Sequence, residues 1–403
     1  LDARLQLLAE QERAKVLTRS ITKGQFTSAL ASVEPSTGYV RAVVAGDDFV
    51  NAKYNLATQG KRQPGSSFKI FVLLAALDAG FSPEDTINGS SPCTLKVPGF
   101  DVYKPGNYEG TSGGTMTITQ ATTNSVNCAY ARLGIAVGLD KVVDMAVGMG
   151  LPRDRLDPFP SISLGAEEVT PLEMASAYAT IANDGVYHAP VFVKKVTDRN
   201  GKVLFQGPGR ARRAFSAQTA RVAIQVMRTV VDRGTGTAAK LPSRQVAGKT
   251  GTSQNYENAW FVGFTPQLAT SVWMGSPIGN VAMTNVGGRK VTGGSYPARI
   301  WGAYMGKALQ GTPVVTFPVP NAKLIPKGKF VKDKACPSSR CPAPSGRSRS
   351  TSTTSGPGFG EFPLPGGPAP VAPGAFPSPT PAPPSAPTVT PEPAPTPTSA
   401  PPG

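Results

Sequence analysis

The feature that most constrains the fold of this chain is a polar turn that leads into its most apolar run. The turn, Gln63 to Lys69, reads Gln-Pro-Gly-Ser-Ser-Phe-Lys, and the run Ile70 to Leu77 follows at once. Pro64 and Gly65 suit the turn that delivers a chain to a helix. The pattern predicts a buried helix from Ser66 to about Gly80, with a serine and a lysine three residues apart on one face.

The composition changes near Asn321. The chain has 403 residues with 44 Gly and 41 Pro, and from Asn321 to Gly403 Pro, Ser, Thr, Ala and Gly dominate. Such a segment buries too little apolar area to offset its chain entropy, so residues 321–403 are predicted to be a disordered or polyproline-like tail. Residues 1–20 are predicted to form an amphipathic linker helix, and residues 21–320 one folded domain.

Hydrophobic periodicity predicts the remaining elements. Helices are expected at 117–133 with a break at Ser125-Val126-Asn127, and at 170–185, 217–231 and 297–309. Strands are expected at 28–33, 39–44, 245–252, 259–264 and 268–274, and residues 81–116 are expected to be a long loop. Strands from both ends of the chain must meet in one sheet, which predicts an α+β domain with a large, mostly helical middle.

The charge balance is strongly basic, with a formal net charge of +16. The tail carries eight Lys and Arg against three Asp and Glu, so about +11 remains on residues 1–320. A basic surface suits an anionic neighbour such as a membrane or a wall polymer, although it also serves solubility. No nucleic-acid partner is predicted, because zinc-finger spacing, RNP-like aromatics and a basic helix are all missing from the sequence.

The choice of a catalytic base is narrow. The only histidine, His188, lies in a turn-like segment, which is typical of an ordinary loop residue. No phosphate-binding loop and no metal-ligand cluster is present in the sequence, so neither a metal nor a cofactor is predicted. Lysine is therefore the candidate base. Its pKa, near 10.4 in water, must be lowered by burial, a helix N-terminus or a second cation.

Three short motifs occur in order along the chain. They are Ser66-x-x-Lys69 at a helix start, Ser125-x-Asn127 at a helix break and Lys249-Thr250-Gly251 on a strand. The first two are weak signals alone and the third is rarer, and structural explanations exist, for example a turn for Ser125-x-Asn127 or an edge-strand lysine for Lys249. The ordered set is the one found in penicillin-binding proteins and class A β-lactamases.

The sequence resembles the transpeptidase domain of a class A, bifunctional penicillin-binding protein over most of residues 1–310. Further stretches support the resemblance: Arg62 to Lys69, Leu164-Gly165, Thr170 to Glu173, Gly248 to Thr252, Ala259 to Gly263 and Gly293 to Ser295. The Pro-rich tail and the cysteines are similar to actinobacterial, mycobacterium-type members. The resemblance implies a serine β-lactamase/DD-peptidase-like fold, with a five-stranded antiparallel sheet flanked by helices and a helical subdomain.

The resemblance also implies roles for individual residues. Ser66 would be the nucleophile and Lys69 its base, Ser125 would relay a proton, Asn127 would hold Lys69 and a substrate amide, and Lys249 would be the second cation. The hydroxyls of Thr250 and Thr252 would bind the substrate carboxylate, with Gly251 leaving room for substrate, and the backbone N–H groups of Ser66 and Thr252 would form the oxyanion hole.

The implied function is a peptidoglycan D,D-transpeptidase that acts on D-Ala-D-Ala termini, releases D-Ala and is acylated by β-lactams. Its partners would be stem peptides, β-lactams and, through the Pro-rich tail, cell-wall or division proteins. The alternatives are a β-lactamase, a D,D-carboxypeptidase and a non-catalytic β-lactam-binding scaffold. Glu167 and Glu168 could be mistaken for a deacylation base, but they are interpreted as acids that precede the Thr170 helix and stabilise its positive end. The motif Ser-Val-Asn favours the penicillin-binding side.

Four cysteines predict an oxidising, extracytoplasmic location. Cys336 and Cys341 are close enough in sequence to close a small loop, and a Cys93–Cys128 bridge is a further hypothesis. The chain starts without Met and has no apolar run that could span a membrane, so a membrane anchor is expected in an upstream segment. The resemblance implies that a glycosyltransferase domain precedes Leu1 as well.

Overall fold

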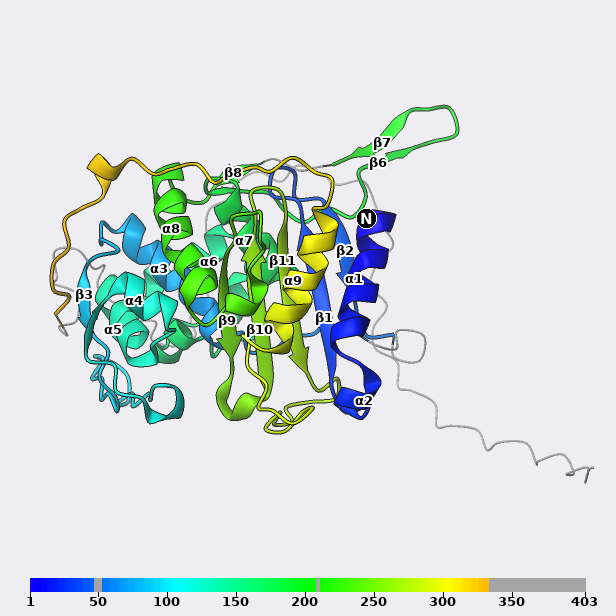
Figure 1. Cartoon of the computed structure of the whole chain (residues 1–403). Coiled ribbons are helices and arrows are strands. Elements are labelled where there is room, and N and C mark those ends of the chain that lie inside the picture. The colour runs from blue at the N-terminus through cyan, green and yellow to red at the C-terminus, as the bar shows by residue number, and fades with distance from the viewer. Residues whose placement is uncertain (47–52, 208–210, 333–403) are drawn as a thin grey trace, which may run out of the picture. The chain divides into compact units, whose positions relative to one another are not determined.

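Five antiparallel strands form the central sheet, and they come from both ends of the chain (Figure 1). The computed structural model describes residues 1–46, 53–207 and 211–332. The strands are β1 (Thr27–Val33), β2 (Val40–Val44), β9 (Ala247–Thr252), β10 (Asn258–Phe264) and β11 (Ala269–Gly275). Their order is β2-β1-β11-β10-β9, so β1 joins the N-terminal hairpin to the three C-terminal strands. The predicted five-stranded α+β sheet is confirmed.

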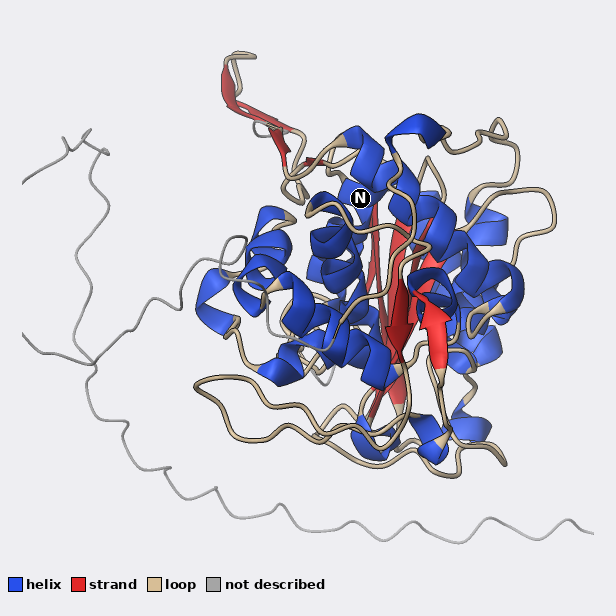
Figure 2. Ribbon diagram, turned by 90° about the vertical axis from the view of Figure 1, so that its left-hand side faces the viewer, coloured by secondary structure: helices blue, strands red, loops and turns tan. Residues whose placement is uncertain are grey.

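Helices cover both faces of this sheet (Figure 2). On one face lie α1 (Ala3–Val16) and α9 (Tyr296–Ala308), and on the other lies α7 (Pro171–Ala182). Along β10, Phe261 meets Trp301 on the α9 side, whereas Trp260 and Val262 belong to the core under α7. Strands β1, β10 and β11 are buried along their whole length, because both of their faces are covered.

A mostly helical region lies beside the sheet. Its elements are α3 (Lys69–Asp78), α4 (Ile118–Thr123), α5 (Asn127–Val137), α6 (Leu139–Gly148) and α8 (Ala217–Arg233). The predicted Ser66 helix begins as a 3-10 turn, Gly65–Phe68, and α3 is buried from Lys69 to Ala76 between α5, α6 and α8. Within the described ranges, no helix has both the length and the apolar character needed to cross a membrane.

The expectation that residues 81–116 form a long loop needs correction. Residues 81–116 are not a plain loop, because β3 (Thr86–Asn88) pairs with β4 (Thr115–Thr117). The other short elements in the described ranges are α2 (Arg19–Thr22), β5 (Val186–Tyr187), β6 (Lys195–Thr197), β7 (Val203–Gln206) and β8 (Arg212–Arg213).

The predicted linker helix is α1, and it is part of the domain, since Leu5 and Ala9 are buried in the core with α9.

The predicted start of the tail at Asn321 is too early. The backbone of Thr86 accepts from Val331 N at 2.7 Å and donates to Lys329 O at 2.9 Å, so residues up to 332 pack on the domain. The Gln218 side chain bonds both the N–H and the carbonyl of Asn321, at 2.9 Å each. Residues 333–403, which include the predicted Cys336–Cys341 bridge and the Pro-rich tail, lie outside the described residues.

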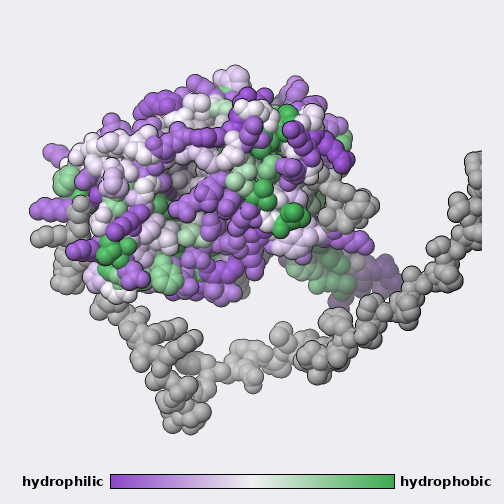
Figure 3. Space-filling model, turned by 90° about the horizontal axis from the view of Figure 1, so that it is seen from below, coloured by the Kyte–Doolittle hydropathy of each residue, from purple (hydrophilic) through white to green (hydrophobic). Residues whose placement is uncertain are grey.

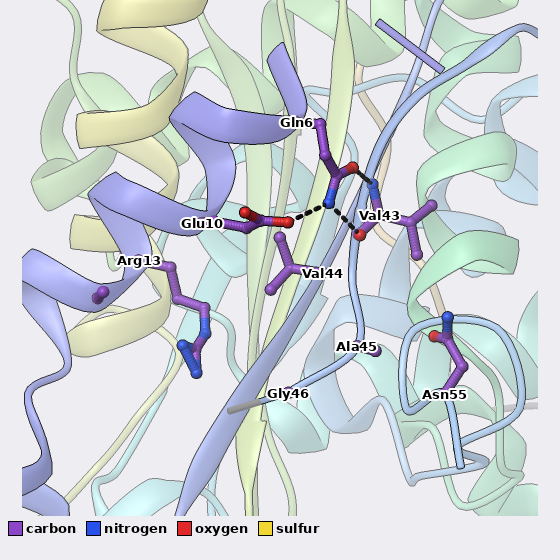
Figure 4. A pocket seen from close by; sticks show the side chains of 9 residues that line it. Gln6, Glu10, Arg13, Val43, Val44, Ala45, Gly46 and Asn55 are labelled. Carbon is purple, nitrogen blue, oxygen red and sulfur yellow. Dashed lines mark hydrogen bonds between the residues drawn. The ribbon is translucent and has the colours of Figure 1, made fainter. Parts of the chain in front are cut away.

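The outer edge of the sheet at β2 is covered by a side chain of α1 (Figure 4). Gln6 Nε2 donates to the Val43 carbonyl, and Gln6 Oε1 accepts from the Val43 N–H, both at 2.8 Å. This side-chain amide thus takes the place of a neighbouring strand and blocks further pairing there. At the opposite edge, β9 faces the Ser66 turn.

Candidate active site

The turn that carries Ser66 is held from both sides by the surrounding backbone. Trp260 Nε1, on β10, donates to the Gln63 carbonyl at 2.8 Å. Arg62 and Val169 exchange two backbone hydrogen bonds of 3.0 Å each. Ser66 therefore lies between the Arg62–Val169 backbone pair and α3, on a turn that these hydrogen bonds hold in place.

Two glycines allow this turn and β9 to approach closely. Gly65 has φ +51°, and a Cβ added there would lie 2.4 Å from the Thr252 carbonyl oxygen. A Cβ at Gly251 would lie 2.2 Å from the Pro64 carbonyl oxygen. The packing of β9 against the turn is thus one reason for a glycine at position 251, and its expected role of leaving room for substrate stays a prediction.

Lys69 is completely buried at the start of α3. Its Nζ donates to the Ser125 carbonyl and to Asn127 Oδ1, at 2.7 Å each, and lies 3.3 Å from Ser125 Oγ. Nζ also lies 5.4 Å from the centre of the buried Tyr130 ring. The structure thus brings together the first two predicted motifs.

Lys249 reaches the same serine from β9. Its Nζ donates to Ser125 Oγ at 2.8 Å and to the Thr250 carbonyl at 3.0 Å. Ser125 itself has φ +58°, a left-handed conformation that serine rarely adopts. That strained backbone places one hydroxyl between two lysines, as is typical of a functional constraint.

Burial lowers the pKa of both lysines, and the Lys249 cation lowers that of Lys69 further. Burial, and then the Lys249 cation, hold the pKa of Lys69 well below its ordinary value. Burial lowers the pKa of Lys249 to about 7. Desolvation disfavours the charged form of each amine, so a neutral amine is available near Ser125 at neutral pH.

Ser66 lines two adjoining cavities. One, of about 300 Å³, is also lined by Tyr108, Ser125, Asn127, Thr235, Thr250, Thr252, Thr292 and Gly294. The other, of about 280 Å³, is lined by residues that include Tyr103, Lys104, Gly106, Gly165, Thr252 and Gln254. The described residues that line these two cavities include no Asp or Glu, so no carboxylate base adjoins Ser66 there.

The loops that border these cavities lie along the lower edge of the domain in Figure 1. Figure 3 views that end from below, and it is mostly hydrophilic with small apolar groups between. In the described ranges, no group of three or more His, Cys, Asp or Glu side chains is placed to hold a metal ion.

The predicted Thr250 and Thr252 have partners that the sequence did not indicate. Thr250 Oγ1 shares a 2.6 Å hydrogen bond with Thr235 Oγ1, and Thr252 Oγ1 accepts from Gly293 N at 3.2 Å. Thr235 follows α8 in a Gly-Thr-Gly-Thr stretch, which was the available signal for it. Tyr108 had no such signal.

Cys93 and Cys128 form a disulfide with a Cα–Cα distance of 5.9 Å. Cys128 directly follows Asn127, so the bridge ties the segment between β3 and β4 to the first turn of α5.

The remaining sequence candidates are not among the described residues that line either cavity. Thr170 caps α7 in a capping box with Glu173, and Glu167 and Glu168 precede that cap, outside both cavity linings. Burial, and then Asp157, raise the pKa of Glu167. His188 lines neither cavity.

The chain is similar in sequence to known proteins. Residues 29–300 match the family model of the penicillin binding protein transpeptidase domain. Penicillin-binding protein 1A of Aquifex aeolicus is 33% identical over 311 residues, which are 76% of this chain and 42% of that protein. The chain thus spans less than half the length of this curated relative.

Solved structures agree. The penicillin-binding protein PonA1 from Mycobacterium tuberculosis has a TM-score of 0.72 at 32% identity, covering 81% of this chain and 89% of that one. PonA1 in complex with penicillin V also has a TM-score of 0.72 at 32% identity, with coverages of 85% and 90%.

Proposed function

Because the chain belongs to the penicillin-binding protein transpeptidase family, we propose that it is the transpeptidase domain of a class A member. It cross-links peptidoglycan stem peptides through an acyl-enzyme on Ser66, and β-lactams acylate the same serine. The observation that carries the proposal is the convergence of Lys69 and Lys249 on Ser125 Oγ, in a cavity that Ser66 lines.

Acylation begins with neutral Lys69. Its amine takes the hydroxyl proton of Ser66 while Oγ attacks the carbonyl carbon of the penultimate D-Ala. The backbone N–H groups of Ser66 and Thr252 hold the developing oxyanion. Loss of one such donor typically costs about 3 kcal/mol of transition-state stabilisation.

Release of D-Ala needs a proton on the leaving nitrogen. The proton passes from Lys69 through the Ser125 hydroxyl, and Lys249 favours this transfer because a second cation disfavours protonated Lys69. An amine of a second stem peptide then attacks the acyl-enzyme, and the proton relay runs in reverse.

The β9 side of the cavity holds the substrate. The Thr250 and Thr252 hydroxyls bind its terminal carboxylate beside the Lys249 amine. The free edge of β9 can pair with an extended peptide, which places the scissile carbonyl near Thr252 N. Asn127 Nδ2 has two N–H groups, so one can donate to the carbonyl of a substrate amide while the other donates to the protein.

Transpeptidation is favoured over β-lactam hydrolysis by what surrounds Ser66. A β-lactamase needs a base that activates a deacylating water, and Glu167 and Glu168 lie outside the described lining of both cavities. We therefore place the chain with enzymes whose β-lactam adduct persists.

The cellular setting follows from the same family. We place the domain on the extracytoplasmic side, where the Cys93–Cys128 disulfide is stable, and propose that an upstream segment anchors it and carries glycosyltransferase activity. The Pro-rich residues after 332 are proposed to act as a spacer or to bind cell-wall or division proteins.

The test is a peptide that ends in D-Ala-D-Ala, incubated with the chain and an amine acceptor. Mass spectrometry is expected to detect D-Ala release and the peptide–acceptor product, both lost in Ser66→Ala. Hydrolysed peptide alone would favour the carboxypeptidase alternative, and no D-Ala release would contradict both activities.

A further inference from the structure

Helix α5, which begins with Asn127, has no cap of its own. The residue before it is Val126, whose side chain makes no capping bond. The first N–H groups of a helix have no acceptor within the helix. Acceptors for this end of α5 must therefore come from elsewhere in the fold.

Asn107, between β3 and β4, supplies one of these acceptors. Its Oδ1 accepts from the Cys128 N–H at 2.9 Å, one residue after Asn127. Its Nδ2 donates to the carbonyls of Gly89 at 2.8 Å and Thr111 at 2.9 Å. Asn107 is only 8% exposed, and an amide with its oxygen and both N–H groups engaged is held in one orientation.

The residue before it contacts the Asn127 side chain directly. Asn127 Nδ2 donates to the Gly106 carbonyl at 2.7 Å. A carbonyl oxygen accepts and does not donate, so this bond fixes which end of the Asn127 amide points to Lys69. Asn127 Oδ1 accordingly accepts from Lys69 Nζ at 2.7 Å.

Two further links hold the Gly106 carbonyl in place. The Asn107 N–H donates to Ser91 Oγ at 3.1 Å. The backbone N–H of Cys93 donates to the Pro105 carbonyl at 3.4 Å, and the disulfide joins Cys93 to Cys128 on α5. The segment 105–107 is thus tied to the first turn of α5 by Asn107 and by a covalent bridge.

From these contacts we propose that Asn107 is a positioning residue for Asn127, and that the Cys93–Cys128 disulfide supports the same arrangement. Asn107 acts through the α5 N-terminus and the Gly106 carbonyl, so that Asn127 presents its oxygen to Lys69 and keeps one N–H for the substrate amide. The inference rests on the proposed role of Asn127 in acylation of Ser66.

The test is a double-mutant cycle on the 403-residue chain, with a fluorescent penicillin as the probe. The saturating rate of acylation and the half-saturating concentration are measured for the native chain, Asn107→Ala, Asn127→Ala and the double variant. Asn107→Ala is expected to slow acylation about tenfold in the native background and less than twofold when Asn127 is already Ala. Replacing both Cys93 and Cys128 by Ser is expected to slow acylation severalfold when Asn127 is present, but not when Asn127 is already Ala.

Asn183→Ala is the matched control, since Asn183 Nδ2 also holds a backbone carbonyl, that of Val186 at 2.9 Å, at the end of α7. It is expected to lower the Tm while leaving acylation unchanged. If Asn107→Ala does not fold, Asn107→Ser takes its place in the same cycle. Equal slowing by the Asn107 substitution in both backgrounds, or none in either, overturns the positioning role alone. A native chain that is never acylated overturns the proposed function as well.

Discussion

Two buried lysines converge on the Ser125 hydroxyl, and their protonation determines what the site can do. Lys69 and Lys249 lie 3.3 Å and 2.8 Å from Ser125 Oγ. Two buried cations so close together repel each other, which favours loss of a proton from one of them. The neutral amine that results can act as the base that we propose for Ser66.

The acylation rate is therefore expected to rise with pH. Below the lowered pKa of Lys69 the amine is protonated and cannot accept the Ser66 proton, so the rate falls on the acid side. Lys249→Met removes the neighbouring cation, which raises the pKa of Lys69 and moves the acid limb to higher pH. The measurement is the second-order rate constant for penicillin from about pH 5 to about pH 9. If the acid limb of the pH profile does not move in Lys249→Met, the Lys249 cation is not what lowers the pKa of Lys69.

Burial of Lys249 is expected to lower the free energy of unfolding. The pKa of Lys249 is about 7 in the folded chain against an ordinary 10.5, so between these values the unfolded chain binds more protons. The free energy of unfolding then rises with pH across that window, and the full cost remains below it. That cost is on the order of 5 kcal/mol, and Lys249→Met relieves it while losing two hydrogen bonds of about 1 kcal/mol each.

Thermal unfolding at neutral pH is thus expected to show a net gain of about 1–3 kcal/mol for Lys249→Met. Acylation at neutral pH is expected to be slower in this variant, in line with the shifted acid limb. The pH slope of stability should also become shallower in this variant. Unchanged or lower stability with the native slope would show that the burial cost is compensated elsewhere.

At the scale of elements, the approach of β9 to the Ser66 turn decides the shape of the site. Gly251→Ala would put a Cβ 2.2 Å from the Pro64 carbonyl, so the turn must move away from β9. Overpacking of this kind costs about 1–3 kcal/mol, and the displaced Thr252 N–H would also slow acylation. Differential scanning calorimetry and acylation rates check both effects.

Gly306→Ala on α9 serves as the control. Its added Cβ would meet only Leu241, at 3.8 Å, so it is expected to be neutral or stabilising. A Gly251→Ala variant that behaves like this control would refute the close approach.

Residues 313–332 form an extended segment whose contribution to stability can be tested. Gln245 Oε1 accepts from Phe317 N at 2.9 Å, and Lys329 N donates to Asp85 Oδ1 at 2.8 Å. The segment thereby links the residues just before β9 to the start of β3, whose partner β4 leads into α4 and Ser125. A chain that ends after Thr312 is expected to unfold several degrees lower and to acylate more slowly.

A chain that ends after Lys332 is expected to match the full chain in both Tm and acylation. Circular dichroism melts of the two truncations decide the question. Equal melting temperatures for both would remove residues 313–332 from the domain.

The sequence predicted the elements that have strong local signals. Strands such as β10 and the capped helix α7 were recognisable from apolar runs and from Thr170 with Glu173. The three-residue β3 and β4 carry too few residues for a period to show, and composition alone placed the tail too early because residues 321–332 pair through backbone atoms. Helix α6 was also missed, although its buried Leu139, Val142, Val143 and Ala146 follow helical spacing.

At the scale of the whole molecule, the fold brings together motifs that lie far apart in the chain. The 3-10 turn Gly65–Phe68 and the first residue of α3 place Ser66 and Lys69 at the boundary between the sheet edge β9 and the helical region, where Ser125 meets both lysines. Those residue types were predictable from short motifs. Tyr108 and Asn107 were not, because they lie outside regular strands and long helices, where tertiary contacts set the placement of the chain.

The most direct test of the account is the intact mass of the chain after a short pulse of penicillin. We expect the mass to increase by one drug molecule, with the adduct on Ser66 persisting for many minutes and lost in Ser66→Ala. Rapid return to the native mass with hydrolysed drug would indicate a β-lactamase instead. No adduct in the native chain would contradict Ser66 as the nucleophile.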